Sequence, residues 1–322
     1  MKTITVLVPT YNEEKNIPLI YERLRKVFAE SLGNYECRIL FVDNSSTDSS
    51  QELIRDLCNK DESVCAIFNV KNFGFARSQF NGLREAEGDA VVMVYADMQD
   101  PPEVIPRLVA EWEKGAKVVC GVKQKSRENP LMFLIRRAYY RLIKRITEVD
   151  HIDQFNGFGL YDRSFIEILR QLDDNLPYLR GIVAEFGADR KEVPYEQDIR
   201  RGGKSSFHFL SLYDFAMLGI TSYSKVIMHL CTIIGAFASL ASIIVSVWTL
   251  IVKLVRWETF AIGAAATQIG VFFLGSMQLF FIGFVGEYIA NINIRTMRHP
   301  VVIEKERINF KRKKGSAEHP VH

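Results

Sequence analysis

The sequence predicts an α/β domain with a mostly parallel central sheet, followed by juxtamembrane helices and a hairpin of two transmembrane helices. Three observations lead to this prediction. Short apolar runs alternate with helical patterns over residues 4–95, polar residues follow each of these runs, and two long stretches with almost no charge lie between residues 226 and 290. The first two observations are typical of a sheet covered by helices, and the third is typical of a membrane protein.

The predicted domain alternates strands and helices. Four apolar runs have the character of buried strands: Ile4–Val8, Arg38–Val42, Ala66–Val70 and Ala90–Tyr95. Helical patterns separate them: Ile17–Ser31, Ser49–Asn59 and Phe75–Glu85. Val118–Gly121 is a candidate fifth strand. Domains of this class bind their ligands at the carboxyl ends of the strands.

Polar residues gather at those carboxyl ends. The four segments that follow the runs are Pro9–Glu14, Asp43–Asp48, Lys71–Gly74 and Asp97–Pro102. One such loop is explained by helix capping, for which Ser45 to Asp48 are well suited. Four loops at corresponding strand ends instead predict a single crevice. The sequence has no GxGxxG or Walker motif, which disfavours dinucleotide and P-loop chemistry.

The fourth loop, Asp97-Met98-Gln99-Asp100, combines carboxylates with an amide. Such oxygen-rich sites suit Mg²⁺ or Mn²⁺, and a bound ion would stabilise a diphosphate as a leaving group. A basic set follows in the chain: Lys123, Lys125, Arg127, Arg136, Arg137, Arg141, Lys144 and Arg145. Its later members are explained equally well by a solvated charged face, and beside a membrane they are also suited to anionic lipid headgroups.

Two apolar stretches predict the membrane hairpin. Val226–Val252 carries no Asp, Glu, Lys or Arg, and Phe260–Ile289 is free of charge until Glu287. Each exceeds the roughly 20 residues that cross about 30 Å of hydrocarbon. The alternative is a pair of buried helices in a soluble protein, but stretches this long and apolar seldom occur there. Because the connection between them is short, both ends of the hairpin are expected on one side of the membrane.

The charge pattern predicts on which side the ends lie. The segment after the second stretch is rich in basic residues: Arg295, Arg298, Lys305, Arg307, Lys311, Arg312, Lys313 and Lys314. By the positive-inside rule this tail and the N-terminal domain face the cytoplasm, although Lys253 and Arg256 in the turn oppose that orientation. We therefore expect a multi-pass protein of the inner or plasma membrane with both termini in the cytoplasm.

The expected parts of the chain have the following limits: 1–206 for the cytoplasmic domain, 207–225 for an amphipathic juxtamembrane helix, 226–290 for the two transmembrane helices and 291–322 for a basic cytoplasmic tail. The juxtamembrane segment suits either the membrane interface or packing on the domain. Thr3–Val8 is too short for a signal peptide. Five scattered cysteines without a CxxC pair argue against disulfides and zinc, and a net charge of +3 gives no case for nucleic acid.

The four loop segments belong to a longer ordered series, which continues with Phe155–Arg163, Arg200–Ser206 and, after the second apolar stretch, Gly286–Tyr288. This series resembles the GT-A catalytic domain of family 2 glycosyltransferases. More narrowly, it is similar to the polyprenyl-phosphate glycosyltransferases, a group that contains dolichyl-phosphate mannose synthases and bacterial bactoprenol glucosyltransferases. The resemblance covers nearly the whole chain.

The resemblance implies an inverting, metal-dependent transfer of sugar from a nucleotide-sugar, with UDP-sugar favoured, to undecaprenyl or another polyprenyl phosphate. It implies these nucleotide-sugar-binding residues: Pro9, Tyr11, Glu13, Asp43, Asn72, Gly74 and Asp97. It implies Asp97 and Gln99 as ligands of Mg²⁺ or Mn²⁺. It implies four residues that grip the acceptor phosphate, Lys123, Arg127, Arg136 and Lys204, and it makes Asp97, Arg127 and Arg136 the catalytic set.

Three positions depart from the pattern of the group. Tyr95 stands where many relatives have an Asp, and Asn44 replaces the second Asp of a common pair. Ser126 stands where many relatives have an Arg, and Arg127 directly follows it.

Three other functions remain open. A processive polysaccharide synthase would share the domain, but Gln197–Arg201 lacks the Trp of its usual motif. A transferase to another membrane acceptor is the second alternative. A catalytically silent nucleotide-sugar binder is the third, and Tyr95 is its main support. The sequence permits a homo-oligomer.

Overall fold

The computed structural model describes residues 1–124, 152, 154–175, 177–187, 189–197, 263–297 and 299–310, some positions between 233 and 255, and only part of the side chains in the last helix. The chain divides into two compact units. The first comprises Met1–Arg136, Asp150–His208 and Arg298–His322, and the second comprises Arg137–Val149 and Phe209–Met297. Each unit is described by itself.

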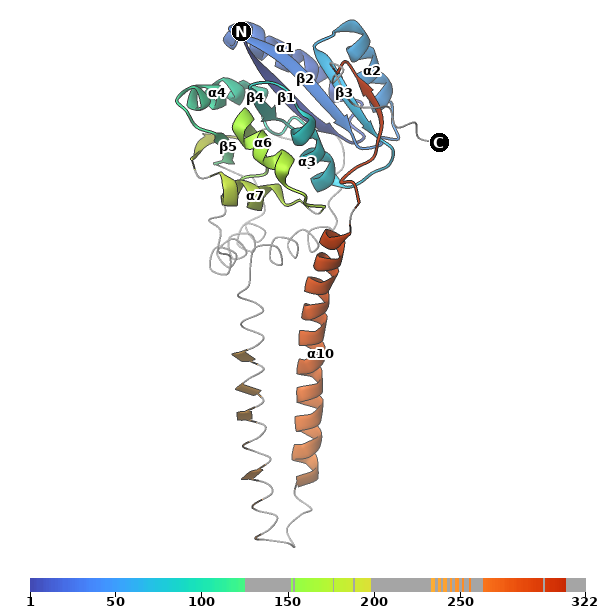
Figure 1. Cartoon of the computed structure of the whole chain (residues 1–322), viewed down its shortest axis with the longest axis vertical. Helices are drawn as coiled ribbons and strands as arrows, with labels where there is room; N and C mark the ends of the chain where they lie inside the picture. The colour runs from blue at the N-terminus through green and yellow to red at the C-terminus, as the bar shows by residue number, and fades with distance from the viewer. Residues whose placement is uncertain are drawn as a thin grey trace. The chain divides into compact units, whose positions relative to one another are not determined.

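The first unit is built on an eight-stranded sheet with the order β7-β5-β6-β4-β1-β2-β3-β8. Figure 1 labels the strands β1 to β5 of this sheet. The strands are β1 (Lys2–Thr10), β2 (Tyr35–Asp43), β3 (Val64–Asn69), β4 (Ala90–Met93), β5 (Val118–Lys123), β6 (Gly159–Asp162), β7 (Arg190–Tyr195) and β8 (Glu304–Ile308). β1 to β4 pair in parallel, which confirms the predicted core of the sheet. β6 and β8 pair antiparallel to their neighbours, so the complete sheet is mixed.

The helices of this unit follow the strands closely. They are α1 (Ile17–Ser31), α2 (Ser50–Lys60), α3 (Phe75–Glu85), a short 3₁₀ turn η1 (Pro102–Val104), α4 (Ile105–Glu113), α6 (Arg163–Gln171) and α7 (Leu179–Phe186). The predicted limits of α1 and α3 are confirmed residue for residue. β4 ends two residues before the predicted Tyr95, because the chain there turns into the loop that carries Asp97.

Helices cover both faces of the sheet. One apolar cluster joins the sheet to α1, α2 and α4, and a second joins it to α3, α6 and α7. Along β1 the side chains alternate, with Val6 and Val8 in the first cluster and Leu7 in the second. This burial on both faces explains why the central strands read as continuous apolar runs.

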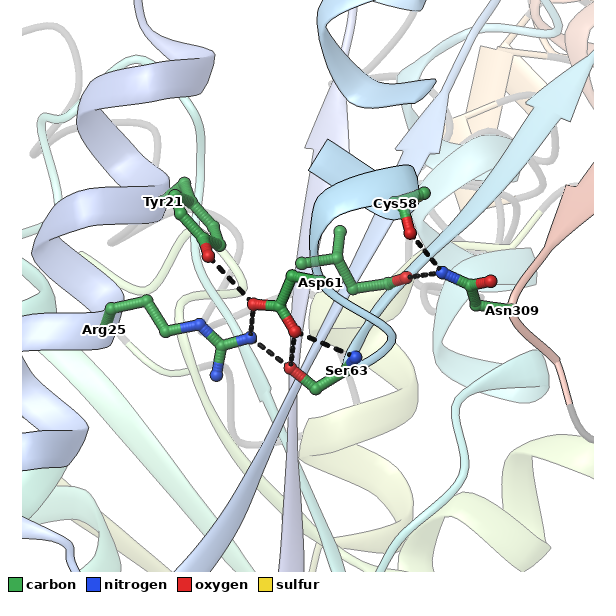
Figure 2. Close-up of polar contacts among 7 residues, drawn as sticks. Tyr21, Arg25, Cys58, Asp61, Ser63 and Asn309 are labelled. Carbon is green, nitrogen blue, oxygen red and sulfur yellow. Dashed lines mark hydrogen bonds and ion pairs between the residues drawn. The ribbon is translucent and has the colours of Figure 1, made fainter. Parts of the chain in front are cut away.

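The strand β8 was not predicted. Residues 291–322 are expected from the sequence to form a basic tail, whereas Glu304–Ile308 pairs antiparallel with β3 and forms an edge of the sheet. Directly after it, Asn309 donates from Nδ2 to the carbonyl oxygens of Cys58 and Val64, both at 2.8 Å (Figure 2). A five-residue strand whose partner lies about 240 positions earlier leaves little trace in the local sequence pattern.

Figure 2 also shows a polar cluster around Asp61, beside the two hydrogen bonds of Asn309, which we call the Asn309 clamp. Asp61 accepts hydrogen bonds from the Tyr21 hydroxyl at 2.8 Å and from the Arg25 guanidinium, and its other carboxylate oxygen accepts from Ser63. These contacts join α1 to the turn between α2 and β3. The turn that Asn309 grips is therefore held from two sides.

The second unit contains the long helix α10 (Gly263–Thr296), which has 34 residues. Within the described part of the chain, no helix combines the length and the apolar character that crossing a membrane requires. Most of the first predicted stretch, Val226–Val252, and the whole of the predicted juxtamembrane helix 207–225 lie outside the described residues. The transmembrane hairpin stays a prediction.

Candidate functional site

The candidate site lies where β1, β2, β3 and β4 end. β2 and β3 lie on one side of β1 and β4 lies on the other, so the strand order reverses at β1. Sheets of this kind bind ligands at such a reversal, outside the carboxyl ends of the strands. Three residues in the loops that follow have left-handed backbones: Asn12 (φ 54°), Ser45 (φ 63°) and Met98 (φ 62°). Non-glycine residues seldom adopt this conformation, and such residues cluster at functional sites.

The loops after β1 and β2 are hydrogen-bonded to each other. The backbone N–H of Asn12 donates to Ser46 Oγ at 2.9 Å, and Asn12 Oδ1 accepts from the N–H of Thr47 at 2.8 Å. The N–H of Glu13 donates to Ser50 Oγ at 2.9 Å. These bonds satisfy backbone groups that a loop otherwise leaves to water. The structure thus fixes the two loops as one surface.

Asp43 ends β2 and is fully buried. Its Oδ2 accepts from the N–H of Ser46 at 3.0 Å and from Gln51 Nε2 at 2.9 Å. Its Oδ1 has no hydrogen-bond partner among the described residues. Burial raises the pKa of the Asp43 carboxyl, although the hydrogen bonds from Ser46 and Gln51 act in the opposite direction. A buried acceptor without a donor is costly, so this oxygen is suited to an N–H group of a ligand.

Asn44 connects the second loop to the third. Its Nδ2 donates to Asn72 Oδ1 at 2.8 Å, while its Oδ1 accepts from Asn69 Nδ2 at 3.1 Å and from the N–H of Phe73 at 3.0 Å. An aspartate at this position would lack the donor that Asn72 requires. The structure therefore explains the departure at Asn44. Asn72 in turn accepts from the N–H of Gly74, whose φ of 86° suits glycine.

The loop after β4 carries the predicted metal ligands. Asp97 Oδ1 accepts from the N–H of Gln99 at 3.2 Å, and Gln99 Oε1 accepts from Gln197 Nε2 at 3.0 Å. No group of three or more His, Cys, Asp or Glu side chains is arranged for a metal in the described part of the chain. The loop therefore offers a small set of oxygen donors in which Asp97 and Gln99 are close in sequence and joined by a hydrogen bond.

Tyr95 points its hydroxyl at protein groups. The hydroxyl oxygen lies 2.8 Å from the carbonyl oxygen of Asn156 and 3.2 Å from Gln79 Oε1. Burial raises the pKa of Tyr95, so the side chain is a neutral phenol at pH 7. It sits against Gly157, where an added Cβ would lie 2.7 Å from the hydroxyl. Tyr95 thus acts as a hydrogen-bonded spacer between β4 and residues 156–157.

The remaining site residues divide into described and undescribed ones. Pro9 pairs with Val42 near the end of β1, Tyr11 is exposed, and Glu13 Oε2 accepts from Asn16 Nδ2 at 2.6 Å. The Lys123 ammonium, at the end of β5, lies 3.9 Å from Asp100 Oδ1. Arg127, Arg136 and Lys204 lie outside the described residues.

Sequence reasoning missed the residues that support the site: Gln51, Gln197, Tyr195, and the side-chain role of Asn156. Gln51 is several residues away from Asp43 in the chain, and the other three lie on different segments from the side chains that they support. Sequence spacing therefore gives no sign of these contacts. At the carboxyl ends of neighbouring parallel strands, the described residues place a buried acceptor at Asp43 and an oxygen-bearing loop at Asp97.

Comparison with known proteins gives a consistent picture. The family profile described as "Glycosyl transferase family 2" matches residues 5–169. A bactoprenol glucosyl transferase of Shigella phage SfX is 32% identical over 305 residues, which are 94% of this chain and 99% of that protein. A prophage bactoprenol glucosyl transferase homolog of Escherichia coli strain K12 is 30% identical over 303 residues, 94% of this chain and 98% of that protein.

A solved structure of glucosyl-3-phosphoglycerate synthase from Mycobacterium tuberculosis, in complex with Mn²⁺, UDP and phosphoglyceric acid, is also similar. Its TM-score is 0.45 at 18% sequence identity, and the match covers 68% of this chain and 76% of that chain.

Proposed function

Because the chain belongs to glycosyl transferase family 2 and is a glycosyltransferase, we propose that it transfers a sugar from a nucleotide-sugar to a polyprenyl phosphate. We take the donor to be a UDP-sugar, the acceptor to be undecaprenyl phosphate, and the product to be a lipid-linked monosaccharide with inverted configuration. The names of the two relatives, both bactoprenol glucosyl transferases or homologs, support the acceptor.

The main support for nucleotide-sugar binding is the buried carboxylate of Asp43. Its Oδ1 lacks a hydrogen-bond donor among the described residues, and it lies at the reversal of strand order where such sheets bind nucleotides. A uracil or guanine ring presents an N–H group that would satisfy this oxygen. The neighbouring loops, which Asn12 and Asn44 hold together, supply the surface for the rest of the nucleotide.

We propose that Asp97 and Gln99 hold a divalent cation, Mg²⁺ or Mn²⁺. A pair of oxygen donors fits such an ion, because Mg²⁺ is usually bound by one or two carboxylates together with substrate phosphates and water. When bound, the ion neutralises charge on the diphosphate leaving group. Tyr95 is not one of these metal ligands, because its neutral hydroxyl lies within hydrogen-bond distance of the Asn156 carbonyl oxygen and Gln79 Oε1.

On the acceptor side, we propose that Lys123, Arg127, Arg136 and Lys204 bind the lipid phosphate. A phosphate is already anionic at neutral pH, so transfer needs little deprotonation. The chain's residues then act mainly by positioning the two substrates and neutralising their charge. The proposed membrane hairpin places the protein in the inner or plasma membrane, where the acceptor's apolar tail is held.

A transfer assay tests this function. The purified full chain is mixed with undecaprenyl phosphate and a panel of labelled UDP- and GDP-sugars, with Mg²⁺, Mn²⁺ or a chelator. We expect one metal-dependent glycolipid that carries a single sugar, and NMR of its anomeric centre reports inversion. A growing polymer would instead indicate a processive synthase, and no glycolipid with any donor would contradict the proposal.

A matched pair of variants sharpens the assay. Asp97→Ala should abolish transfer while the protein stays folded, and Asp56→Ala, which changes an exposed carboxylate on α2, should leave transfer unchanged. Near-wild-type turnover by Asp97→Ala would remove this residue from the metal site.

A further inference from the structure

Asp100 is a buried carboxylate at the junction of several segments of the site. Its side chain is 1% exposed. Its Oδ2 accepts from Asn156 Nδ2 at 2.8 Å, and its Oδ1 accepts from the hydroxyl of Tyr195. The ammonium of Lys123 lies 3.9 Å from the same Oδ1. Asp100 therefore contacts the end of β5, the end of β7 and the segment before β6.

The two hydrogen-bond partners of Asp100, Asn156 and Tyr195, connect it to other residues of the candidate site. The carbonyl of Asn156 accepts from the hydroxyl of Tyr95 at 2.8 Å, and its Oδ1 accepts from the N–H of Phe158 at 3.0 Å. Tyr195 lies two residues before Gln197, which donates to Gln99. Asp100 and Gln99 are adjacent in the chain, so the end of β7 and the residues directly after it hold this loop at two successive side chains.

Burying the Asp100 carboxylate costs desolvation free energy, and its hydrogen bonds offset that cost. A buried carboxylate is unfavourable unless its oxygens are hydrogen-bonded, and here both are. The backbone it anchors includes Met98 with its left-handed φ of 62°, a conformation that persists only where surrounding contacts enforce it. Without an acceptor at position 100, the buried Tyr195 hydroxyl and Asn156 amide would lose their partner.

We propose that Asp100 is a positioning residue for sugar transfer: its carboxylate fixes the Asp97–Gln99 loop against Tyr195 and Asn156 without touching the substrates. This inference rests on the proposed function, because it assigns Asp97 and Gln99 to the metal and diphosphate. The role is carried by the hydrogen-bond geometry of Asp100, and its negative charge is secondary.

The first test is Asp100→Asn, which keeps the size of the side chain but replaces one acceptor oxygen with a donor. The new amide cannot accept from both Asn156 and Tyr195, so the loop loses one anchor. We expect binding of Mn²⁺ alone to the protein, followed by electron paramagnetic resonance, to weaken about tenfold, as expected for one lost hydrogen bond. We expect kcat to fall at least as much, with a smaller change in the KM of the lipid acceptor.

The decisive test combines Asp100→Asn with Asn156→Asp. The amide introduced at position 100 then donates to the carboxylate introduced at position 156, which still accepts from the N–H of Phe158. The Tyr195 hydroxyl keeps an acceptor at position 100. Every hydrogen bond is restored while the negative charge moves to another residue, so we expect Mn²⁺ affinity and kcat to return to within about threefold of the wild type.

Two outcomes would overturn the proposal. Unchanged Mn²⁺ binding and kcat in Asp100→Asn would show that the carboxylate positions nothing. An exchange that leaves Mn²⁺ affinity and kcat as low as in Asp100→Asn would assign the role to charge. Asp56→Asn is the control for an exposed carboxylate. Should Asp100→Asn fail to fold, Tyr195→Phe removes only one donor and should shift Mn²⁺ binding in the same direction.

The Mn²⁺ titration needs no turnover. A wild type that binds Mn²⁺ but transfers no sugar would refute the proposed function. The Mn²⁺ affinities of the wild type and Asp100→Asn would still test whether Asp100 positions the Asp97–Gln99 loop.

Discussion

At the carboxyl end of β2, Asp43 combines full burial with one oxygen that the described residues leave without a donor. Its counterpart Asn44 has the opposite character, because all of its amide contacts are used to join the loops after β2 and β3. These adjacent side chains thus have different roles: Asp43 keeps an acceptor oxygen for a ligand, whereas Asn44 is hydrogen-bonded to other protein groups. The difference follows from donor and acceptor chemistry.

This contrast yields a prediction for Asp43→Asn. The amide can keep one oxygen for Ser46 and Gln51, and its NH₂ group then replaces the unpaired oxygen and opposes an N–H of the base. We expect affinity for UDP, measured by isothermal titration calorimetry, to fall at least tenfold. Asp56→Asn should bind UDP as the wild type does, and equal affinity in both variants would contradict the assigned role of Asp43.

The same variant should not be less stable at neutral pH. Because the pKa of Asp43 is raised in the folded state, its contribution to stability is fully present below the ordinary value of 3.8 and is lost as the pH rises through the raised pKa. Ionisation of this buried carboxyl therefore destabilises the fold above the raised pKa, and the amide of Asp43→Asn cannot ionise. We expect an equal or higher Tm for the variant at pH 7, and a clear fall in Tm would refute this explanation.

At the scale of elements, Asp162 connects β6, α6 and α4. Its Oδ1 accepts from the N–H of Ser164 at 3.0 Å and caps α6, and its Oδ2 accepts from Trp112 Nε1 at 2.7 Å. Lys117 lies 3.1 Å away. Although burial acts to raise it, the hydrogen bonds from Ser164, Trp112 and Lys117 lower the pKa of Asp162 to about 2.

Asp162→Ala should destabilise the first unit by about 2–4 kcal/mol, because α6 loses its cap and the indole N–H of Trp112 loses its acceptor. A group with a depressed pKa contributes stability above its ordinary value of 3.8 and loses it as the pH falls through about 2. The difference in free energy of unfolding between wild type and variant, from denaturant titration, should therefore be smaller at pH 3 than at pH 7. A difference that grows at pH 3 would contradict the assigned contacts.

The C-terminal strand provides a second prediction at this scale. Asn309 adopts a left-handed φ of 60° and donates to two carbonyls, so Asn309→Ala loses both bonds and strains the backbone. We expect a loss of about 1–3 kcal/mol in the free energy of unfolding. Asn59→Ala, at an exposed helix position, is the matched control and should be neutral. Equal stability of the two variants would show that the clamp contributes nothing.

At the scale of the whole molecule, the pairing of β3 with β8 constrains the path of the chain. β3 precedes both apolar stretches and β8 follows them, yet the two strands belong to one sheet. A folded sheet lies on one side of a membrane, so the chain between the strands must cross it an even number of times. The proposed two-helix hairpin meets this condition.

A protease-protection experiment checks this topology. We expect epitope tags at the N-terminus and the C-terminus to be digested together in inverted membrane vesicles and protected together in right-side-out vesicles. Tags on opposite faces would contradict both the two-helix hairpin and the β3–β8 pairing. Tags that both face outward would contradict the cytoplasmic orientation that the positive-inside rule predicts.

The sequence alone determined the alternation of strands and helices, the exact limits of α1 and α3, and the loops that carry the site. These features follow from local patterns, namely apolar periodicity and polar residues after strands, which are written in neighbouring residues. The family also followed from sequence, because its motifs form an ordered series along the chain.

Only the tertiary structure decided how those loops are held. Asp100 meets Tyr195 across 95 positions, Asn44 meets Asn72 across 28, and β8 reaches β3 from the far end of the chain. Such contacts depend on which segments the fold brings together, and a hydrogen-bonding side chain carries no mark of its distant partner. The sequence therefore identified Asp43 and Asp97 as candidates, and the folded chain showed which carboxylates it supports and which oxygen it leaves open.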